Sequence, residues 1–247
     1  MVEQEEDDWS SDNSDFLEDF LQGMSPFAHE FYRENYQPDP SNLSPDGVSL
    51  LQDYVMSSKS GKASLVRRAI RLGCSPNHKA HNGMSVLAYA CVADRPRLEV
   101  VQILLQENAS ANSAGTLAGN LASTPDAFKF FELFKSRNYD FACVDTLNQT
   151  ILFKAGFQML YKQKANLDIL LMLHQWGACL NAVDKFDMTF VDYLVSNDHR
   201  LRKVRQTVLE WLPPLVSHGF DITLLKPATL HALGCDTVLS IYCKEVC

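Results

Sequence analysis

Four segments of this chain repeat one order of residue types, and this repeat limits the possible folds more than any other feature. Each segment has a turn residue, a spacer, Ser or Thr, and then two apolar residues. The segments are residues 46–51, 82–87, 147–152 and 186–191. Asn, Asp and Gly tolerate positive φ, and a Ser or Thr side chain can cap the first free amides of a helix. Each segment therefore predicts a tight turn that leads into a helix.

A second pattern follows the first and marks where helices end. Residues 65–73, 100–108, 130–138 and 169–177 align without gaps, and each closes on Gly or Asn. These two residues best accept the left-handed conformation at a helix C-terminus. Helix ends are therefore predicted at Gly73, Asn108, Asn138, Gly177 and Gly219.

The spacing of these patterns gives the period of the repeat. The apolar marker residues that close the first pattern are Leu51, Leu87, Leu121, Leu152, Val191 and Leu230. They are separated by 31 to 39 residues, which brackets the roughly 33-residue turn-helix-helix unit of ankyrin arrays.

Residues 45–247 resemble an ankyrin-repeat protein, and residues 81–114 are the best single copy. The family's Gly-x-Thr-Pro-Leu-His-x-Ala opening is matched by Gly83, Ser85, Leu87 and Ala90. Its second helix and Gly-Ala-x-x-Asn exit are matched by Val100, Val101, Leu104, Leu105, Ala109 and Asn112. The exit recurs at Gly177, Ala178 and Asn181, and residues 229–232 resemble a degenerate last opening.

The resemblance implies an all-α ankyrin-repeat solenoid of about six helix-turn-helix units. Their expected boundaries are 45–80, 81–114, 115–144, 145–183, 184–223 and 224–247. Three departures stand out: residues 118–143 lack the turn signal, residues 162–166 look like an insertion between helices, and Pro213-Pro214 falls within an expected helix. Because proline removes a helical donor and clashes with the preceding turn, we expect that helix to break or restart there.

The resemblance also implies a function, because the family typically binds proteins on the concave strip made by hairpin tips and first helices. We expect an adaptor or scaffold that is not an enzyme and binds one or more proteins of unknown identity. By register, the exposed strip should include Lys79, His81, Tyr89, Asp145, Thr146, Lys154, Asp184, Lys185, Phe186, Asp187 and Asp192. Phe186 either anchors a partner or packs on the adjacent repeat, since aromatic residues concentrate interface energy.

The N-terminal segment, residues 1–44, has a different character. Residues 1–40 hold twelve acidic groups and one basic group, a net charge of −11, so the rest carries +3 of the total of −8. Asp15 and Glu18 resemble a helix-capping pair, and Phe16, Leu17, Phe20 and Leu21 then share one helical face. The segment is either disordered, a motif that docks in a partner's groove, or an internal ligand of the basic solenoid. As an effector or autoregulatory element, it would make the chain a transcriptional or signalling regulator.

Two clusters of basic residues leave a choice between solvated helix faces and a site for phosphate or an acidic peptide. They are Arg67, Arg68 and Arg71, and Arg200, Arg202, Lys203 and Arg205. A net charge of +3 is too small for general nucleic-acid affinity, which grows with the number of phosphates neutralised. No nucleic-acid partner is therefore expected.

Other features argue against catalysis, cofactors and membrane insertion. The seven cysteines include no Cys-x-x-Cys pair, so we expect buried thiols and no metal. No phosphate loop, His-Glu-x-x-His or Gly-x-Ser-x-Gly motif occurs, which predicts no cofactor and no small-molecule substrate. His174 and His218 should lie near helix C-termini, where a cation complements the helix dipole. The remote enzymatic alternative is a nucleophile pair formed by Cys91 or Cys143 with a histidine. Without an apolar stretch of about 20 residues, we expect a cytoplasmic or nuclear protein, monomeric on its own.

Overall fold

A computed structural model of the chain describes residues 48–56, 63–196, 201–234 and 238. These residues form helices joined by turns, and they contain three isolated β-bridges but no strand. The chain divides into two compact units, residues 1–114 (unit 1) and 115–247 (unit 2). The expected docking face of Phe16, Leu17, Phe20 and Leu21 lies outside the described residues, as do Arg200 and the side chain of Arg202.

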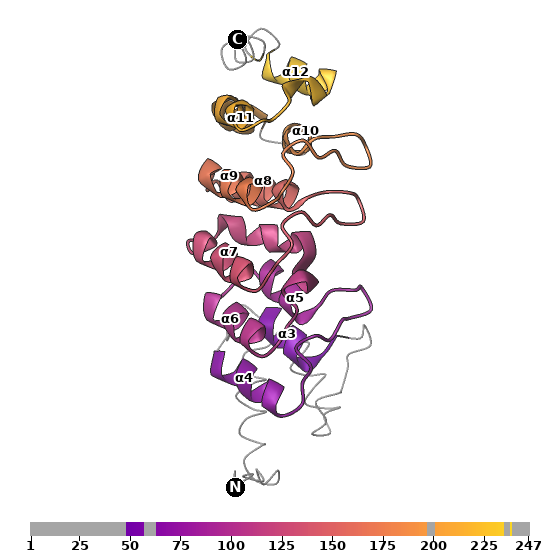
Figure 1. Cartoon of the computed structure of the whole chain (residues 1–247), viewed down its shortest axis with the longest axis vertical. Helices are drawn as coiled ribbons and strands as arrows, with labels where there is room; N and C mark the ends of the chain where they lie inside the picture. The colour runs from indigo at the N-terminus through magenta and orange to yellow at the C-terminus, as the bar shows by residue number, and fades with distance from the viewer. Residues whose placement is uncertain (1–47, 57–62, 197–200, 235–237, 239–247) are drawn as a thin grey trace. The chain divides into compact units, whose positions relative to one another are not determined.

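Unit 1 contains two pairs of antiparallel helices. The first pair is α3 (Leu50–Met56) with α4 (Ala63–Arg71), and the second is α5 (Val86–Val92) with α6 (Leu98–Gln106). Figure 1 shows the second pair stacked on the first, first helix on first helix and second on second. Apolar residues spaced along each helix meet between the pairs, and Leu51, Val66, Leu87, Val101 and Leu104 are completely buried.

Unit 2 is also built from helix pairs, and three of its α-helices are longer than any described helix of unit 1. Its elements are the main part of the 3-10 helix η1 (Ala111–Ser123), α7 (Ala127–Ser136), α8 (Ile151–Tyr161), α9 (Leu167–Gln175), α10 (Phe190–Ser196), α11 (Leu201–Ser217), the 3-10 turn η2 (Ile222–Leu224) and α12 (Pro227–Leu233). In Figure 1 the α8–α9 pair lies directly against the α10–α11 pair. The core is rich in aromatic rings, including Phe130, Phe131, Phe134 and Phe153.

The predicted helix ends are confirmed at all five positions. Gly73, Asn108, Asn138, Gly177 and Gly219 have φ values of 104°, 66°, 56°, 120° and 94°. In each case the next residue donates its amide to the carbonyl five residues back, at 2.8–3.1 Å. This is the bond that satisfies a free carbonyl at the end of a helix. One local signal therefore closes the second helix of five successive repeats.

The marker residues confirm the period of the repeat. Leu51, Leu87, Leu121, Leu152 and Val191 are at most 1% exposed, and each lies in the first helix of its repeat. Leu230 holds the same place in α12 and is half-buried. The chain thus repeats one helix pair with one buried position in common.

Side-chain bridges join consecutive repeats at their exits. Asn77 donates from Nδ2 to the Asn108 carbonyl at 2.8 Å and accepts the Ser110 amide at 2.8 Å. Asn181 makes the same two bonds to the Gly219 carbonyl and the Asp221 amide, each at 2.8 Å. Each asparagine therefore binds the left-handed turn that ends the next repeat.

The third repeat departs from the prediction of two α-helices. Its first helix is the 3-10 helix η1, and Gly115 inside it has non-helical angles of φ 51° and ψ −153°. The segment is rich in Ala, Gly and Ser, so it approaches α8 very closely. A Cβ on Gly119 would lie 2.7 Å from the Ile151 carbonyl oxygen and 2.9 Å from the Ala155 amide nitrogen. The small side chains of this segment therefore let its backbone pack directly against the backbone of α8.

The predicted break at Pro213-Pro214 is wrong, because α11 runs through both residues. The prolines remove two donors, but the helix keeps a buried side formed by Val208, Leu212 and Leu215. Packing of that side offsets the missing backbone bonds, since tertiary contacts supply most helical stability in proteins. The predicted insertion between helices is wrong: residues 162–166 join α8 to α9 over the same length as residues 93–97 join α5 to α6. The extra residues of this repeat lengthen its first helix instead, since α8 has 11 residues and α5 has 7.

Candidate functional site: an aromatic surface on unit 2

Two neighbouring hairpins of unit 2 carry exposed apolar side chains at their tips. Val144, Leu147 and Phe186 are 50%, 39% and 64% exposed, and we call these three residues the fingertip patch. The two hairpins are joined directly: Asn148 donates from Nδ2 to the Val183 carbonyl at 2.7 Å, and the Lys185 amide donates to the Leu147 carbonyl at 2.9 Å. The patch is therefore held on a single hydrogen-bonded edge, which projects from the helices in Figure 1.

An aspartate shapes each of these hairpins from within. Asp145 Oδ1 accepts the amides of Leu147 and Gln149 at 2.8 and 3.0 Å. Asp184 Oδ1 accepts the amides of Phe186 and Met188 at 2.8 and 3.1 Å. Such bonds fix a tight turn, because the carboxylate replaces the partners that the turn's amides lack. The positive φ values of Asn148 (61°) and Asp187 (53°) complete the two turns.

Beside the hairpins, the first helices α8 and α10 present a row of aromatic rings, which we call the aromatic strip: Phe157, Tyr161 and Tyr193. Phe157 stacks on Tyr161 with ring centroids 6.0 Å apart and meets Tyr193 edge to face at 6.0 Å. Buried Phe153 supports Tyr193 at 5.6 Å. Tyr161 is 69% exposed. The ring contacts therefore run from Phe153 in the core, through the strip, to the surface at Tyr161.

Tyr193 has a chemical environment of its own. Burial raises the pKa of the Tyr193 phenol, and the negative charges of Asp145 and Asp184 raise it further. The hydroxyl therefore stays protonated well beyond neutral pH. Phenols of this kind offer both an apolar ring and a polar tip to an interface.

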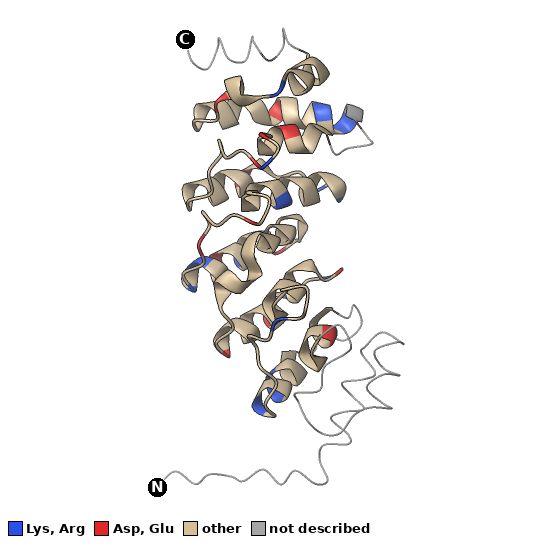
Figure 2. Ribbon diagram, turned by 90° about the vertical axis from the view of Figure 1, so that its right-hand side faces the viewer, with Lys and Arg blue, Asp and Glu red and all other residues tan. Residues whose placement is uncertain are grey.

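The C-terminal end of α8 is basic. Lys162 and Lys164 follow the helix and are exposed, and Lys203 of α11 donates from Nζ to Gln163 Oε1 at 2.6 Å. Figure 2 shows basic residues gathered at the first turns of α11. We call Lys162, Lys164 and Lys203 the basic cluster, and it adjoins the exposed end of the aromatic strip at Tyr161.

The structure brings together eight of the eleven predicted strip residues on unit 2, but not all of them reach the surface. Thr146, Lys185, Phe186 and Asp187 are exposed, and Asp145 and Lys154 are half-buried. The prediction of exposure is wrong for Asp184 and Asp192, which are 3% and 1% exposed.

Asp192 is buried because it serves the fold. Its Oδ2 accepts both the amide and the hydroxyl of Thr189, at 2.9 and 2.8 Å, and its Oδ1 accepts the Lys226 amide at 2.9 Å. The Asp192 amide in turn donates to Thr189 Oγ1 at 3.2 Å. This reciprocal capping box starts α10 and ties it to the start of α12.

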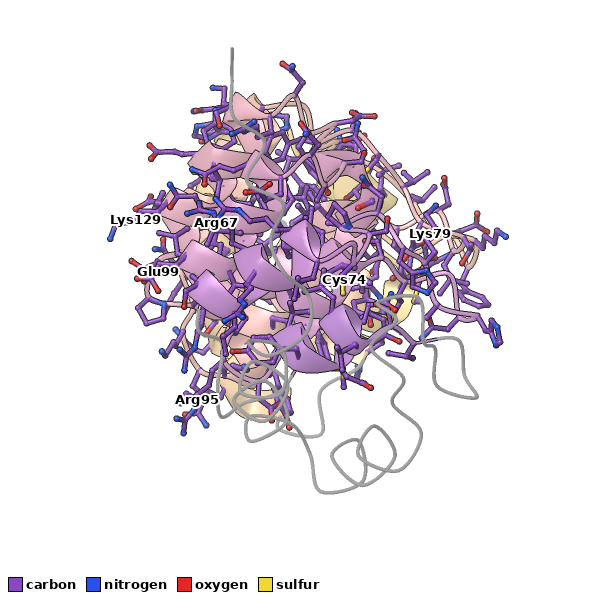
Figure 3. All side chains as sticks on the ribbon, turned by 90° about the horizontal axis from the view of Figure 1, so that it is seen from below. Arg67, Cys74, Lys79, Arg95, Glu99 and Lys129 are labelled. Atoms are coloured by element: carbon purple, nitrogen blue, oxygen red, sulfur yellow. The ribbon has the colours of Figure 1, made fainter. Side chains whose placement is uncertain are left out.

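Unit 1 carries the other three predicted residues. Lys79 and His81 are exposed on the first hairpin, whereas Tyr89 is 7% exposed and its hydroxyl accepts a bond from Asn82 Nδ2 at 3.0 Å. The prediction of exposure is thus wrong for Tyr89. Figure 3 shows Lys79 and Arg95 projecting on opposite sides of this unit, with Cys74 placed among the helices.

The register argument missed Val144, Leu147, Phe157, Tyr161 and Tyr193. One signal could have found two of them: Lys154, Phe157, Gln158 and Tyr161 are spaced at i, i+3, i+4 and i+7, and all are at least partly exposed. Aromatic residues on the polar face of an amphipathic helix do not contribute to the hydrophobic core that its apolar face packs into. Phe186 is 64% exposed, so it does not pack away on the adjacent repeat.

The thiols named in the enzymatic alternative lack the properties of a nucleophile. Burial places the pKa of the Cys91 thiol far above its ordinary value. Burial is also the largest cause that raises the pKa of Cys143. A reactive cysteine needs a lowered pKa and exposure instead. His174 and His218 lie at helix C-termini, as predicted, where each ring contacts a backbone carbonyl, at 2.9 and 2.7 Å.

Neither a metal-binding cluster nor a membrane-spanning helix occurs in the part of the chain that the structure describes. No three His, Cys, Asp or Glu side chains lie close enough together in this part of the chain to hold a metal ion. None of the described helices is both long and apolar enough to cross a bilayer.

No protein-family model matches the sequence, and no curated protein matches it. Solved structures do. The ankyrin repeat domain of Bcl-3, a member of the IkappaB protein family, has a TM-score of 0.59 and 17% identity, covering 92% of this chain and 96% of that one. The human ASB11 ankyrin repeat domain has a TM-score of 0.56 and 16% identity, covering 88% and 95%.

A third match is a chain in the structure of the predatory endopeptidase Bd0816 from Bdellovibrio bacteriovorus in complex with immunity protein Bd3460. Its TM-score is 0.53 at 21% identity, covering 72% of this chain and 89% of that chain. The shared architecture, the left-handed helix ends and the buried markers agree: this chain has the fold of an ankyrin-repeat protein.

Proposed function

We propose that the chain is a non-catalytic adaptor or scaffold that binds a partner protein through the fingertip patch and aromatic strip of unit 2. The resemblance to ankyrin arrays would make this the concave face. The observation that carries the proposal is the exposure of Phe186 and Tyr161, at 64% and 69%, on elements held rigid by hydrogen bonds and packing.

Such a surface suits protein binding for two physical reasons. Large aromatic side chains supply much of the binding free energy at interfaces, and a few of them dominate. A preordered surface also loses little conformational entropy when a partner docks. Here the turns are fixed by Asp145 and Asp184, and the rings of Phe157 and Tyr193 support each other.

The proposal is tested by affinity purification with full-length wild type and a Leu147→Ala/Phe186→Ala double variant, followed by quantitative mass spectrometry. A partner that depends on the fingertip patch should fall at least about tenfold in recovery, since loss of one anchor costs about 2 kcal/mol. Phe128→Ala and Leu224→Ala are matched controls, because these side chains are 42% and 38% exposed elsewhere on the same unit.

The contrast between the variants decides the result. Partners lost equally from all of them would reflect general surface hydrophobicity, and partners retained by the double variant would place the interface elsewhere. Either result would refute this assignment of the binding surface.

A further inference from the structure

Lys154 is the only charged residue of α8, and it lies on the same face of that helix as two rings of the aromatic strip. Lys154, Phe157 and Tyr161 are spaced at i, i+3 and i+7, so their side chains follow one another along α8. Nine lysines fall within the described residues, and seven of them are exposed, whereas Lys154 and Lys226 are half-buried. Lys154 therefore packs against the protein where the strip begins, instead of extending into solvent.

A chain of two hydrogen bonds positions the Lys154 ammonium group. Lys154 Nζ donates to Gln149 Oε1 at 3.4 Å, and Gln149 Nε2 donates to Asp184 Oδ2 at 3.1 Å. Gln149 and Asp184 are both buried, so the amide that receives the lysine has a fixed orientation. An ammonium group has three N–H donors, of which Gln149 takes one at a long distance. A ligand that brings acceptors therefore meets a donor that is already in place.

The carboxylates inside the two hairpins are occupied by the hairpins themselves. Asp184 accepts two amides of its own turn at Oδ1 and the Gln149 side chain at Oδ2. Asp145 accepts two amides of its turn at Oδ1 and the Thr116 hydroxyl at Oδ2, at 3.5 Å. The polar groups at the base of the hairpins therefore offer a partner mainly hydrogen-bond donors.

The tip of the second hairpin has no net charge. Lys185 and Asp187 flank Phe186, and both are exposed, so their opposite charges offset each other. Lys154 is thus the charged group that can distinguish one partner from another beside the aromatic strip.

We propose that the partner presents a carboxylate side chain next to a large apolar one, and that Lys154 receives the carboxylate while the apolar side chain packs on Phe157 and Tyr161. The inference rests on the proposed function, because it specifies the chemistry of the partner that would bind this surface of unit 2.

The placement of Lys154 makes it the residue that determines specificity. Hydrogen bonds between an ammonium group and a carboxylate are shorter and stronger than those between neutral groups. Lys154 is already packed and held by Gln149, so pairing costs it less side-chain entropy than it would cost the exposed Lys185.

A random peptide library displayed on phage supplies the probe, because selection against the full-length protein requires no known partner. Phage that bind wild type but not the Leu147→Ala/Phe186→Ala variant are ligands of the proposed surface. Their sequences should be enriched in Asp or Glu adjacent to aromatic or large aliphatic residues. The same residue types in the unselected library are the reference for enrichment.

The strongest selected peptide is then synthesised in two forms, one with its Asp or Glu and one with the corresponding Asn or Gln. By fluorescence anisotropy, wild type should bind the acidic form at least about fivefold more tightly than the amide form, as close charge pairs at interfaces do. Lys154→Met keeps the aliphatic stem and should bind both forms equally, whereas Lys154→Arg should keep the preference. Lys185→Met is the matched control and should leave the ratio unchanged. Because each ratio compares two peptides on one protein, a change in the stability of a variant cancels.

The outcomes separate this inference from the proposed function. Enrichment of Lys or Arg in place of acids, or an unchanged ratio in Lys154→Met, would overturn the inference and retain the surface, since these peptides still depend on Leu147 and Phe186. Peptides that depend on Lys154 but bind the Leu147→Ala/Phe186→Ala variant normally would retain the inference and reject the fingertip patch. A selection that yields no such peptides would count against both.

Discussion

Gln149 on one hairpin of unit 2 donates from Nε2 to Asp184 Oδ2 on the next hairpin at 3.1 Å, and both side chains are buried. Asp184 also accepts two amides of its own turn. A single carboxylate thus holds the shape of one hairpin and its attachment to its neighbour.

Replacing Asp184 by Ala should lower the free energy of unfolding by about 2 kcal/mol, because three donors lose their acceptor in a buried setting. Urea denaturation of the full-length protein measures this difference. Asp187→Asn is the matched control, since it removes one carboxylate from the same exposed turn and Asn tolerates the observed φ of 53°. Equal stability of the two variants would contradict a structural role for Asp184.

The two N-cap threonines of unit 2 should respond oppositely to replacement by Val. Thr189 exchanges hydrogen bonds with Asp192, so Thr189→Val should cost about 1–2 kcal/mol. Thr150 Oγ1 is buried and has no hydrogen-bond partner in the described structure, so Thr150→Val should be neutral or stabilise by up to about 1 kcal/mol. Thermal unfolding of the two variants checks the prediction, which fails if Thr150→Val is the more destabilising.

Gly119→Ala should destabilise unit 2 by about 1–3 kcal/mol, because the new methyl group would meet backbone atoms of α8 at 2.7 and 2.9 Å. Gly156→Ala is an instructive comparison within α8. Its methyl would meet only the flexible side chain of Leu194, at 3.0 Å, while helix propensity improves by about 1 kcal/mol. Chemical denaturation should rank Gly119→Ala well below Gly156→Ala, and the opposite order would argue against close packing at η1.

The cysteines should differ sharply in reactivity. Burial raises the pKa of Cys74 from 9.0 to about 11, so only about one thousandth of it is thiolate at pH 8. Cys91 is also buried with a raised pKa, whereas Cys179 is exposed. Iodoacetamide labelling of the native protein, mapped by mass spectrometry, should modify Cys179 at least about a hundredfold faster than Cys74 or Cys91. In urea this difference should vanish, and a fast native reaction at Cys74 would show that its site opens readily.

The helix ends were predictable from sequence because they depend on local conformation. Gly73 and Asn138 adopt positive φ at a lower conformational free-energy cost than other residue types would, so residue type alone marks the position. The buried markers were equally accessible, since a repeated apolar position at constant spacing implies a repeated packing contact.

The features that the sequence did not reveal depend on contacts between distant segments. The 3-10 form of η1 follows from its close approach to α8, and the continuity of α11 through Pro213 follows from its buried side. Register placed Asp184 and Asp192 near the surface, but their turn and cap geometry directs both carboxylates inward. The spacing of Tyr161 from Lys154 and Phe157 can be read in the sequence, but its exposure of 69% depends on how α8 packs against the rest of the unit.

The asparagine bridges at Asn77 and Asn181 affect how the protein comes apart. Each side chain satisfies a carbonyl and an amide of the following repeat, so separating two neighbours exposes both groups at once. Fraying one residue at a time is therefore unfavourable at these junctions. Local opening should proceed in steps of a whole repeat, and amides on either side of a bridge should exchange with solvent as one cooperative block.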